Sequence, residues 1–432
     1  MLVGVMLPLT ALAGESGADS GNTAWMIAAT VLVMLMTAPG LAFFYGGLVR
    51  RKNALSIMMQ CLVITAVISI EWIAVGYSWV FGSGFMDGGL LGEFIGGFEK
   101  VFLRGVSLET LSGGGIPETL FALFQCMFAV ITPALIIGAF AERINFPGFL
   151  VFAIAWALLV YNPMAHWVWG NGWMQRLGVI DFAGGTVVHV NAGVSALVMA
   201  VLLGRRESLR GGQPVAPHSI PFVVLGATLL WIGWFGFNAG SGLAADGLAA
   251  NAFLVTHLAT SAAVVTWMAL DWLVSKKPTV VGVCTGAVAG LVAITPGAGS
   301  VDALGALFIG VASAGVCYLF VTILKPRLGY DDALDAFGVH GVGGFVGALL
   351  AGVFATRLVT GDGGPEGALY GDWNQLWIQA AVNAVAACFC ALATYVLFKV
   401  VDKVIGLRIT RDKEAIGLDV SQHGEIAYGE NE

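Results

Sequence analysis

The stretch "DFAGGTVVHV" at residues 181–190 places a carboxylate, Asp181, and an imidazole, His189, in a run that is otherwise apolar and rich in glycine. An ionisable side chain inside a bilayer costs about 2.5–3.5 kcal/mol on insertion scales, so such residues are rare there and usually face a bundle interior or a cavity. The stretch therefore predicts a membrane-spanning helix whose polar side chains line a path through a helical bundle.

The composition of the whole chain supports a membrane protein. Of 432 residues, 58% are hydrophobic and only 11% are charged, whereas a soluble globular domain carries about 25% charged residues. The 60 glycines are typical of transmembrane helices that approach one another closely. The six cysteines lie in apolar runs without metal-type spacing, so we interpret them as small apolar residues and expect no metal site.

Apolar segments divide the chain. Residues 1–13, "MLVGVMLPLTALA", end in Ala-x-Ala and resemble a secretory signal peptide, although no Lys or Arg precedes them. Eleven apolar segments follow, each long enough for a ~30 Å hydrocarbon core at 1.5 Å per residue. We place them at about 24–48, 54–81, 117–140, 148–168, 181–203, 219–242, 247–274, 278–296, 302–324, 333–357 and 375–401.

Basic residues set the expected orientation. Lys and Arg follow the odd-numbered segments, as in Arg50, Arg51 and Lys52, whereas few lie between the others. By the positive-inside rule the odd-numbered segments end in the cytoplasm. The N-terminus is therefore expected outside and the C-terminus in the cytoplasm.

A short motif recurs five segments later. "IDFAGGTVVHVNAG" (180–193) and "LDAFGVHGVGG" (334–344) each contain an Asp, then a His, among glycines. An odd offset of five predicts an inverted repeat of halves 24–203 and 219–357, with 375–401 outside it, and such repeats place the substrate path where the halves meet.

Two interpretations of the histidines in this motif stand side by side. His189 lies roughly 12 Å in from one face, and His340 roughly 7–8 Å in from the other, counting 1.5 Å per residue from Asp181 and Asp335. They form either a joint site or two unrelated core histidines, and the repeat favours the joint site. Both aspartates are expected to cap helices.

Other polar residues have more ordinary interpretations. Glu71 and His257 lie within segments and are expected to form interhelical hydrogen bonds or subunit contacts. His166, near a helix end, is expected to be solvated. Aromatic clusters near helix ends form either interfacial belts or, where the rings face inward, a cation site.

Several motifs together resemble one family. "GLAFFYGGLVRRKN", "FAVITPALIIGAFAERI", "HWVWGNGW", "DFAGGTVVHVNAG", "GWFGFNAGS" and "DAFGVHGVGG" occur in the order of the ammonium transporter family, in its bacterial and plant branch. The resemblance implies an all-α integral membrane fold of eleven helices (24–401) with a five-plus-five inverted repeat. It also implies a homotrimer with one pore per subunit in the inner (plasma) membrane.

The resemblance also implies roles for individual residues. The outer recruitment site corresponds to Phe124, Phe128, Trp169 and Ser241. The gate corresponds to Phe128 and Phe237. The pore positions correspond to Asp181, His189, His340, Trp234, Phe44 and Tyr45. His257 and Asp246 depart from the usual family pattern, away from the assigned path.

A physical argument then limits the mechanism. Moving an intact small cation into a low-dielectric medium costs on the order of 20 kcal/mol in the idealised Born picture, more than a few aromatic faces offset. We therefore expect ammonium or methylammonium to lose its proton near the gate and to cross in the neutral form. A neutral imidazole suits this passage because it donates from one nitrogen and accepts at the other.

Other functions remain as alternatives. An ammonium sensor with little net transport is one, although only about thirty residues follow Val401. A membrane metalloenzyme is another, although the chain lacks HExxH, so we expect neither an enzyme nor a cofactor. The tail (402–432) is either a solvated end or, by resemblance, a regulatory segment that docks across subunits and meets a PII-type signalling protein. Membrane lipid is an expected partner, and nucleic acid is not.

Overall fold

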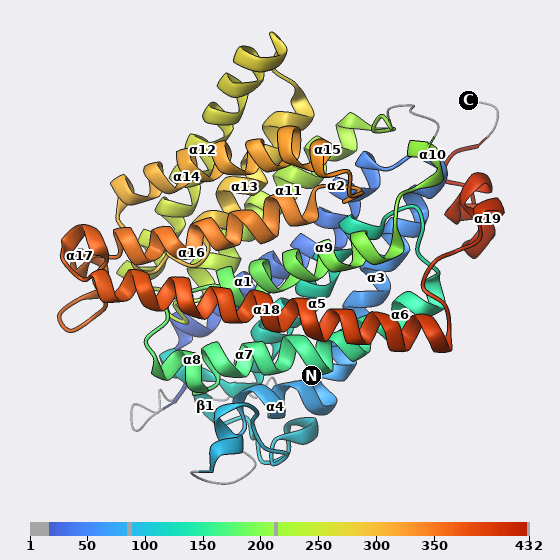
Figure 1. Cartoon of the computed structure of the whole chain (residues 1–432). Helices are drawn as coiled ribbons and strands as arrows, with labels where there is room; N and C mark the ends of the chain where they lie inside the picture. The colour runs from blue at the N-terminus through green and yellow to red at the C-terminus, as the bar shows by residue number, and fades with distance from the viewer. Residues whose placement is uncertain (1–16, 84–88, 211–214, 430–432) are drawn as a thin grey trace, which may run out of the picture.

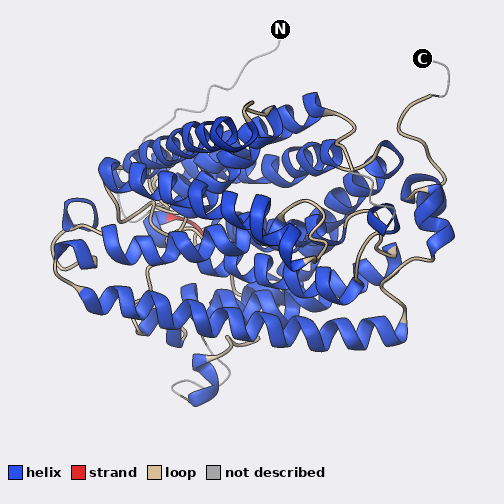
Figure 2. Cartoon of the chain, turned by 45° about the horizontal axis from the view of Figure 1, so that its top comes forward, coloured by secondary structure: helices blue, strands red, loops and turns tan. Residues whose placement is uncertain are grey.

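The structure is a computed structural model that describes residues 17–83, 89–210 and 215–429. The predicted signal peptide at 1–13 lies outside the described residues. Helices make up most of the described chain (Figure 2). A short antiparallel pair, β1 (Leu111–Ser112) and β2 (Ile116–Pro117), precedes α5.

Ten helices in the described ranges are long and apolar enough to cross a membrane. They cover residues 20–48, 51–81, 118–140, 146–176, 185–203, 220–240, 247–275, 303–328, 337–354 and 373–404. Their main helical elements are α1 (Ser20–Leu35), α2 (Ala42–Leu48), α3 (Ala54–Glu71), α4 (Tyr77–Phe81), α5 (Glu118–Phe140), α6 (Phe146–Trp156), α7 (Asn162–Trp169), α9 (Asn191–Leu203), α11 (Ile220–Gly240), α12 (Gly247–Ser275), α14 (Ala303–Tyr318), α15 (Lys325–Leu328), α16 (Val342–Phe354) and α18 (Trp373–Val404). Ten of the eleven predicted segments coincide with these helices.

The remaining predicted segment, 278–296, is a shorter helix, α13 (Val280–Ile294), of 15 residues. At 1.5 Å per residue it is roughly 22 Å long, which is less than the hydrocarbon core. The all-helical membrane fold is therefore observed, whereas α13 falls short of the length expected from the sequence.

Turns of π-helix interrupt several of the long helices. Two of them, Gly185–Val190 and Phe337–Gly341, carry His189 and His340. Two others, Trp72–Gly76 and Ala157–Tyr161, join α3 to α4 and α6 to α7. Because π-bulges are rare and frequently mark functional sites, these four turns are candidate functional positions.

The helices pack lengthwise into one bundle. In Figure 1, α16 and α9 each run along α18, and each contacts it. The short helices α8 (Trp173–Arg176) and α17 (Arg357–Thr360) lie at one end of the bundle. The short helices α10 (Glu207–Arg210) and α19 (Arg411–Ile416) lie at the other end.

Candidate functional site

An outer pocket of about 190 Å³ lies at the end of the bundle near α8. Phe128, Trp169 and Ser241, all assigned to the recruitment site by resemblance, line it together. The remaining lining residues are Phe81, Phe121, Gln125, Gln175, Phe182 and Leu243. Phe124 does not line the pocket, because it is fully buried with its ring centroid 5.0 Å from that of Phe128.

Phe128, which lines this pocket, stacks on Phe237. The centroids of Phe128 and Phe237 lie 4.3 Å apart at an interplanar angle of 27°, and both side chains are buried. Trp169 packs edge-on against Phe128 at 5.8 Å. Its indole N–H donates to the carbonyl of Asp181 at 2.9 Å, which fixes the ring orientation.

Directly beyond the stacked phenylalanines, the two histidines of the repeated motif meet. His189 Nδ1 and His340 Nδ1 lie 3.3 Å apart, and the rings stack at 5.3 Å and 17°. His189 also stacks on Trp234 at 5.3 Å and lies 6.1 Å from Phe237. Because one Nδ1 must donate and the other accept, the contact suits two neutral imidazoles that share one proton.

Small residues make this meeting possible. A methyl group added at Gly193 would lie 2.0 Å from the backbone nitrogen of Gly341. One added at Gly344 would lie 2.8 Å from Cβ of His189 and 3.1 Å from the nitrogen of Val190. Each glycine follows its own histidine by four residues and contacts the backbone just after the other histidine. The crossing is therefore locally two-fold.

Two carboxylates hold the backbone that precedes the histidines. Asp181 accepts four backbone N–H groups, from Gly184, Gly185, Thr186 and Val187. Asp332 accepts two, from Ala336 at 3.0 Å and Phe337 at 2.8 Å. Both precede their histidine by eight residues.

Asp335, which the sequence suggested as the second cap, is not one. Its φ of 62° turns the chain into the left-handed region, and its carboxylate pairs with Lys325. The equal spacing of eight residues in Asp181–His189 and Asp332–His340 is the signal in the sequence that could have identified Asp332 and was missed.

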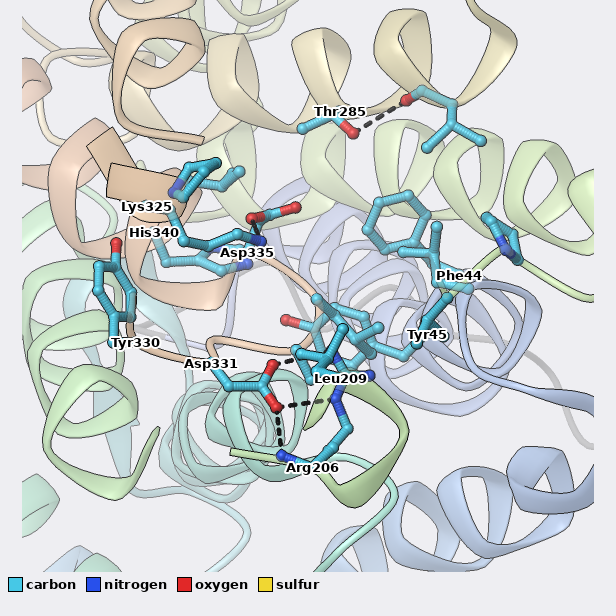
Figure 3. A pocket seen from close by; sticks show the side chains of 18 of the residues that line it. Phe44, Tyr45, Arg206, Leu209, Thr285, Lys325, Tyr330, Asp331, Asp335 and His340 are labelled. Atoms are coloured by element: carbon cyan, nitrogen blue, oxygen red, sulfur yellow. Dashed lines mark hydrogen bonds and ion pairs between the residues drawn. The ribbon is translucent and has the colours of Figure 1, made fainter. Parts of the chain in front are cut away.

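An inner cavity of about 380 Å³ lies on the other side of the histidine pair (Figure 3). His340, Phe44 and Tyr45 line it, and Tyr45 donates to the carbonyl of Leu135 at 3.2 Å. The ring of Trp234 lies 5.5 Å from that of Phe237 and 5.3 Å from that of His189, and its indole N–H donates to Thr295 at 2.8 Å. Phe128, Phe237, Trp234, His189 and His340 therefore form one line of ring contacts from the outer pocket to this cavity. Phe124 packs behind Phe128, and Asp181 holds the turn before His189.

A buried ion network forms one wall of the inner cavity. Arg206 bonds Asp331 through Nε (3.0 Å) and Nη2 (2.8 Å), and its Nη1 lies 3.4 Å from Glu142 (Figure 3 shows the Arg206–Asp331 contact). Arg50 pairs with the same Glu142 at 2.9 Å. Burial acts to raise the pKa of Asp331, but the bonds and charge of Arg206 hold that pKa below its ordinary value.

The tail docks on the loops at this end of the bundle. Asp419 accepts the backbone N–H of Ser56 at 2.8 Å and of Leu55 at 3.1 Å, so it caps the first turn of α3. Leu418 N–H donates to Asn53 at 2.8 Å. Burial raises the pKa of Asp419. A freely solvated tail is therefore the wrong interpretation for its described part.

The other polar residues lie away from this line. His257 is exposed on α12, 5.4 Å from the ring of Trp231, and Asp246 caps α12 through Ala249 N–H. His166 is buried, and its two nitrogens contact the carbonyls of Val80 and Gly92. The expectation of a solvated His166 was wrong, because the loop after α4 folds over this helix end.

Comparisons with known proteins place the chain. The model of the "Ammonium Transporter Family" matches residues 24–428. The chain is 46% identical to an ammonium transporter of Bacillus subtilis over 409 residues, which cover 94% of this chain and 98% of that protein. It is 42% identical to the ammonium transporter Amt1 of Archaeoglobus fulgidus, covering 95% and 100%.

Solved structures agree with these relatives. The fold matches the crystal structure of Candida albicans Mep2 with a TM-score of 0.85 at 37% identity, covering 91% of this chain and 87% of that one. It also matches a structure described as a sensor Amt protein, with a TM-score of 0.84 at 31% identity, covering 93% and 98%. The chain belongs to the ammonium transporter family.

Proposed function

We propose that this protein conducts ammonium across the membrane as ammonia, through the line of residues from the outer pocket to the inner cavity. Ammonium is recruited among Phe128, Trp169 and Ser241, where aromatic faces attract a cation and Ser241 accepts a hydrogen bond from it. At the gate the cation passes its proton to a water molecule of the outer pocket, since the Born cost of a bare cation exceeds what the rings supply. This proton crosses by a route separate from that of the ammonia, so that net transport of ammonium carries charge.

The observation that carries this proposal is the 3.3 Å contact between His189 and His340. Ammonia both donates and accepts hydrogen bonds, and a pair of neutral imidazoles offers one group of each kind along a buried wall. His189 Nε2 has no hydrogen-bond partner among the described residues, so it is available to a passing molecule. An intact cation would find no carboxylate at this point, whereas the neutral molecule needs none.

Architecture and assembly form part of the same proposal. We infer eleven spans, with α13 as the eighth, in two inverted halves (24–203 and 219–357), with the N-terminus outside and the C-terminus in the cytoplasm. The local two-fold relation of Gly193 and Gly344 supports the inverted repeat. The signal peptide at 1–13, the homotrimer and the inner-membrane location rest on the family resemblance. The tail (402–432), part of which docks on the loops before α3, is proposed as the segment that a PII-type protein contacts.

A second candidate function is ammonium sensing, which the match to a sensor Amt protein favours. The experiment that separates the two is ammonium-evoked current and methylammonium uptake in proteoliposomes of the purified protein. Transport predicts a current that rises and saturates with ammonium and is small with potassium. Ammonium binding without current or uptake would support the sensor and contradict the transporter.

A further inference from the structure

A second buried polar cluster lies outside the line of pore residues, around Glu71. Glu71 ends α3 within the span that covers residues 51–81, ten residues before the end of that span at Phe81. At 1.5 Å per residue this is roughly 15 Å from the helix end, so the carboxylate lies at membrane depth. Glu71 lines neither the outer pocket nor the inner cavity.

One contact ties this carboxylate to the neighbouring span. Asn162 Nδ2 donates to Glu71 Oε1 at 2.9 Å. Asn162 is fully buried, as is the preceding Tyr161. The ring of Tyr161 packs 6.3 Å from that of Trp72, the residue after Glu71. Among the described residues no Lys or Arg forms an ion pair with Glu71, so its charge has no cationic partner within that part of the chain.

Three oxygen atoms of the cluster are buried without a hydrogen-bond partner among the described residues. They are Glu71 Oε2, Asn162 Oδ1 and Tyr161 OH. The three atoms form no hydrogen bonds with one another. Moving a proton from one of them to another would therefore give none of them a hydrogen-bond partner at these positions. Buried polar atoms in native proteins are almost always satisfied, and an exception calls for a water or an ion.

The backbone around the cluster is irregular in both helices. A π-helical turn follows Glu71 directly (Trp72–Gly76), and another ends at Tyr161 (Ala157–Tyr161). Gly76 closes the first turn against the cluster, since a methyl group there would lie 3.1 Å from both Glu71 Oε1 and Asn162 Nδ2. π-Bulges are rare and are frequent at functional sites.

We propose that Glu71, Asn162 and Tyr161 bind one small monovalent cation, such as potassium or ammonium, at a site separate from the conduction path. One carboxylate and two neutral oxygens match a single positive charge, and water would complete the coordination shell of the cation. This proposal does not depend on the proposed pore mechanism.

The direct test is diffraction from crystals of the full-length protein soaked in thallium(I), with rubidium as a second probe. We expect an anomalous peak bounded by Glu71 Oε2 and Asn162 Oδ1 in the wild type. The peak should be lost in Glu71→Gln and kept in Glu93→Gln, a control carboxylate of the outer loop. A wild-type site without a peak, or with ordered water in its place, would overturn the proposal.

A measurement in solution provides a second criterion that needs no crystals. We expect sodium, potassium or rubidium chloride to raise the thermal unfolding midpoint relative to N-methylglucamine chloride of equal ionic strength, because a ligand of the native state stabilises it. The shift should be lost in Glu71→Gln and regained in the charge-moved variant Glu71→Gln/Asn162→Asp. An equal shift in wild type and Glu71→Gln would contradict the site even if transport were unaffected.

Discussion

The Nδ1 atoms of His189 and His340 lie 3.3 Å apart although 151 residues separate them in the chain. The contact exists because Gly193, near the start of α9, lies against the π-helical turn that carries His340, and Gly344, near the start of α16, lies against the turn that carries His189. A carboxylate eight residues before each histidine, Asp181 or Asp332, holds the corresponding π-helical turn. The predictions below follow from these parts and from the ion network beneath them.

A methyl group added at Gly193, where the two helices approach each other, should destabilise the fold. In Gly193→Ala the new methyl would meet the backbone of Gly341, and overpacking of this kind costs roughly 1–3 kcal/mol. We expect a lower unfolding midpoint in detergent and reduced methylammonium uptake. Gly315→Ala is the matched control, since a methyl there meets nothing within 4 Å. Equal effects of the two substitutions would refute the steric account.

Removing the charge of Asp181 should loosen the turn that carries His189. An amide cannot accept four N–H groups as a carboxylate does, because its NH₂ group donates only. We expect Asp181→Asn to lose transport and some stability. Asp246 caps α12 away from the pore; because Asn caps a helix as well as Asp does, Asp246→Asn should change stability little while transport persists. Normal uptake by Asp181→Asn would count against its proposed positioning role.

The free energy of unfolding should depend on Arg206, through the ion network, and not on Arg205. Arg206→Met would leave Asp331 and Glu142 buried without this partner, and breaking a buried pair from one side costs roughly 3–5 kcal/mol. Arg205 is exposed next to it, so Arg205→Met serves as the control with little expected effect. Chemical unfolding in detergent measures both, and similar losses would show that the network contributes nothing specific.

The same network predicts a loss of stability in acid. Burial acts to raise the pKa of Glu142, but Arg206 and Arg50 hold that pKa below its ordinary value, as Arg206 does for Asp331. The stabilisation is therefore present above the unfolded-state pKa values of about 4, and it is lost as the pH falls through the lower folded-state values. The unfolding midpoint should fall below pH 4 in the wild type and less so in Arg206→Met. Parallel profiles would contradict this assignment.

The tail should be held by its cap on α3. Asp419→Ala frees the N–H groups of Leu55 and Ser56, at a cost of about 1 kcal/mol. We expect faster proteolysis of the tail in this variant, whereas Asp412→Ala, at an exposed position, should leave the rate unchanged. Deletion after Gly417 should alter transport or PII binding. An unchanged cleavage rate in Asp419→Ala would show that the cap does not retain the tail.

Hydropathy and the histidine motif predicted the helical segments and the meeting of His189 with His340, because depth in a membrane follows from counting residues. Asp335 was predicted as the second helix cap, whereas Asp332 has that role. The difference depends on a left-handed turn at residue 335, which the composition does not reveal. Burial of His166 and docking of Asp419 were missed as well. Both depend on loops and a tail folding back over helix ends, for which hydropathy carries no signal.

The most direct test of the histidine pair is ammonium-evoked current on a solid-supported membrane for His189→Ala and His340→Ala, with potassium as the competing ion. The account predicts that each variant loses ammonium current or admits potassium, because the wall that accepts only the neutral molecule is broken. Unchanged ammonium current and unchanged exclusion of potassium in both variants would contradict it.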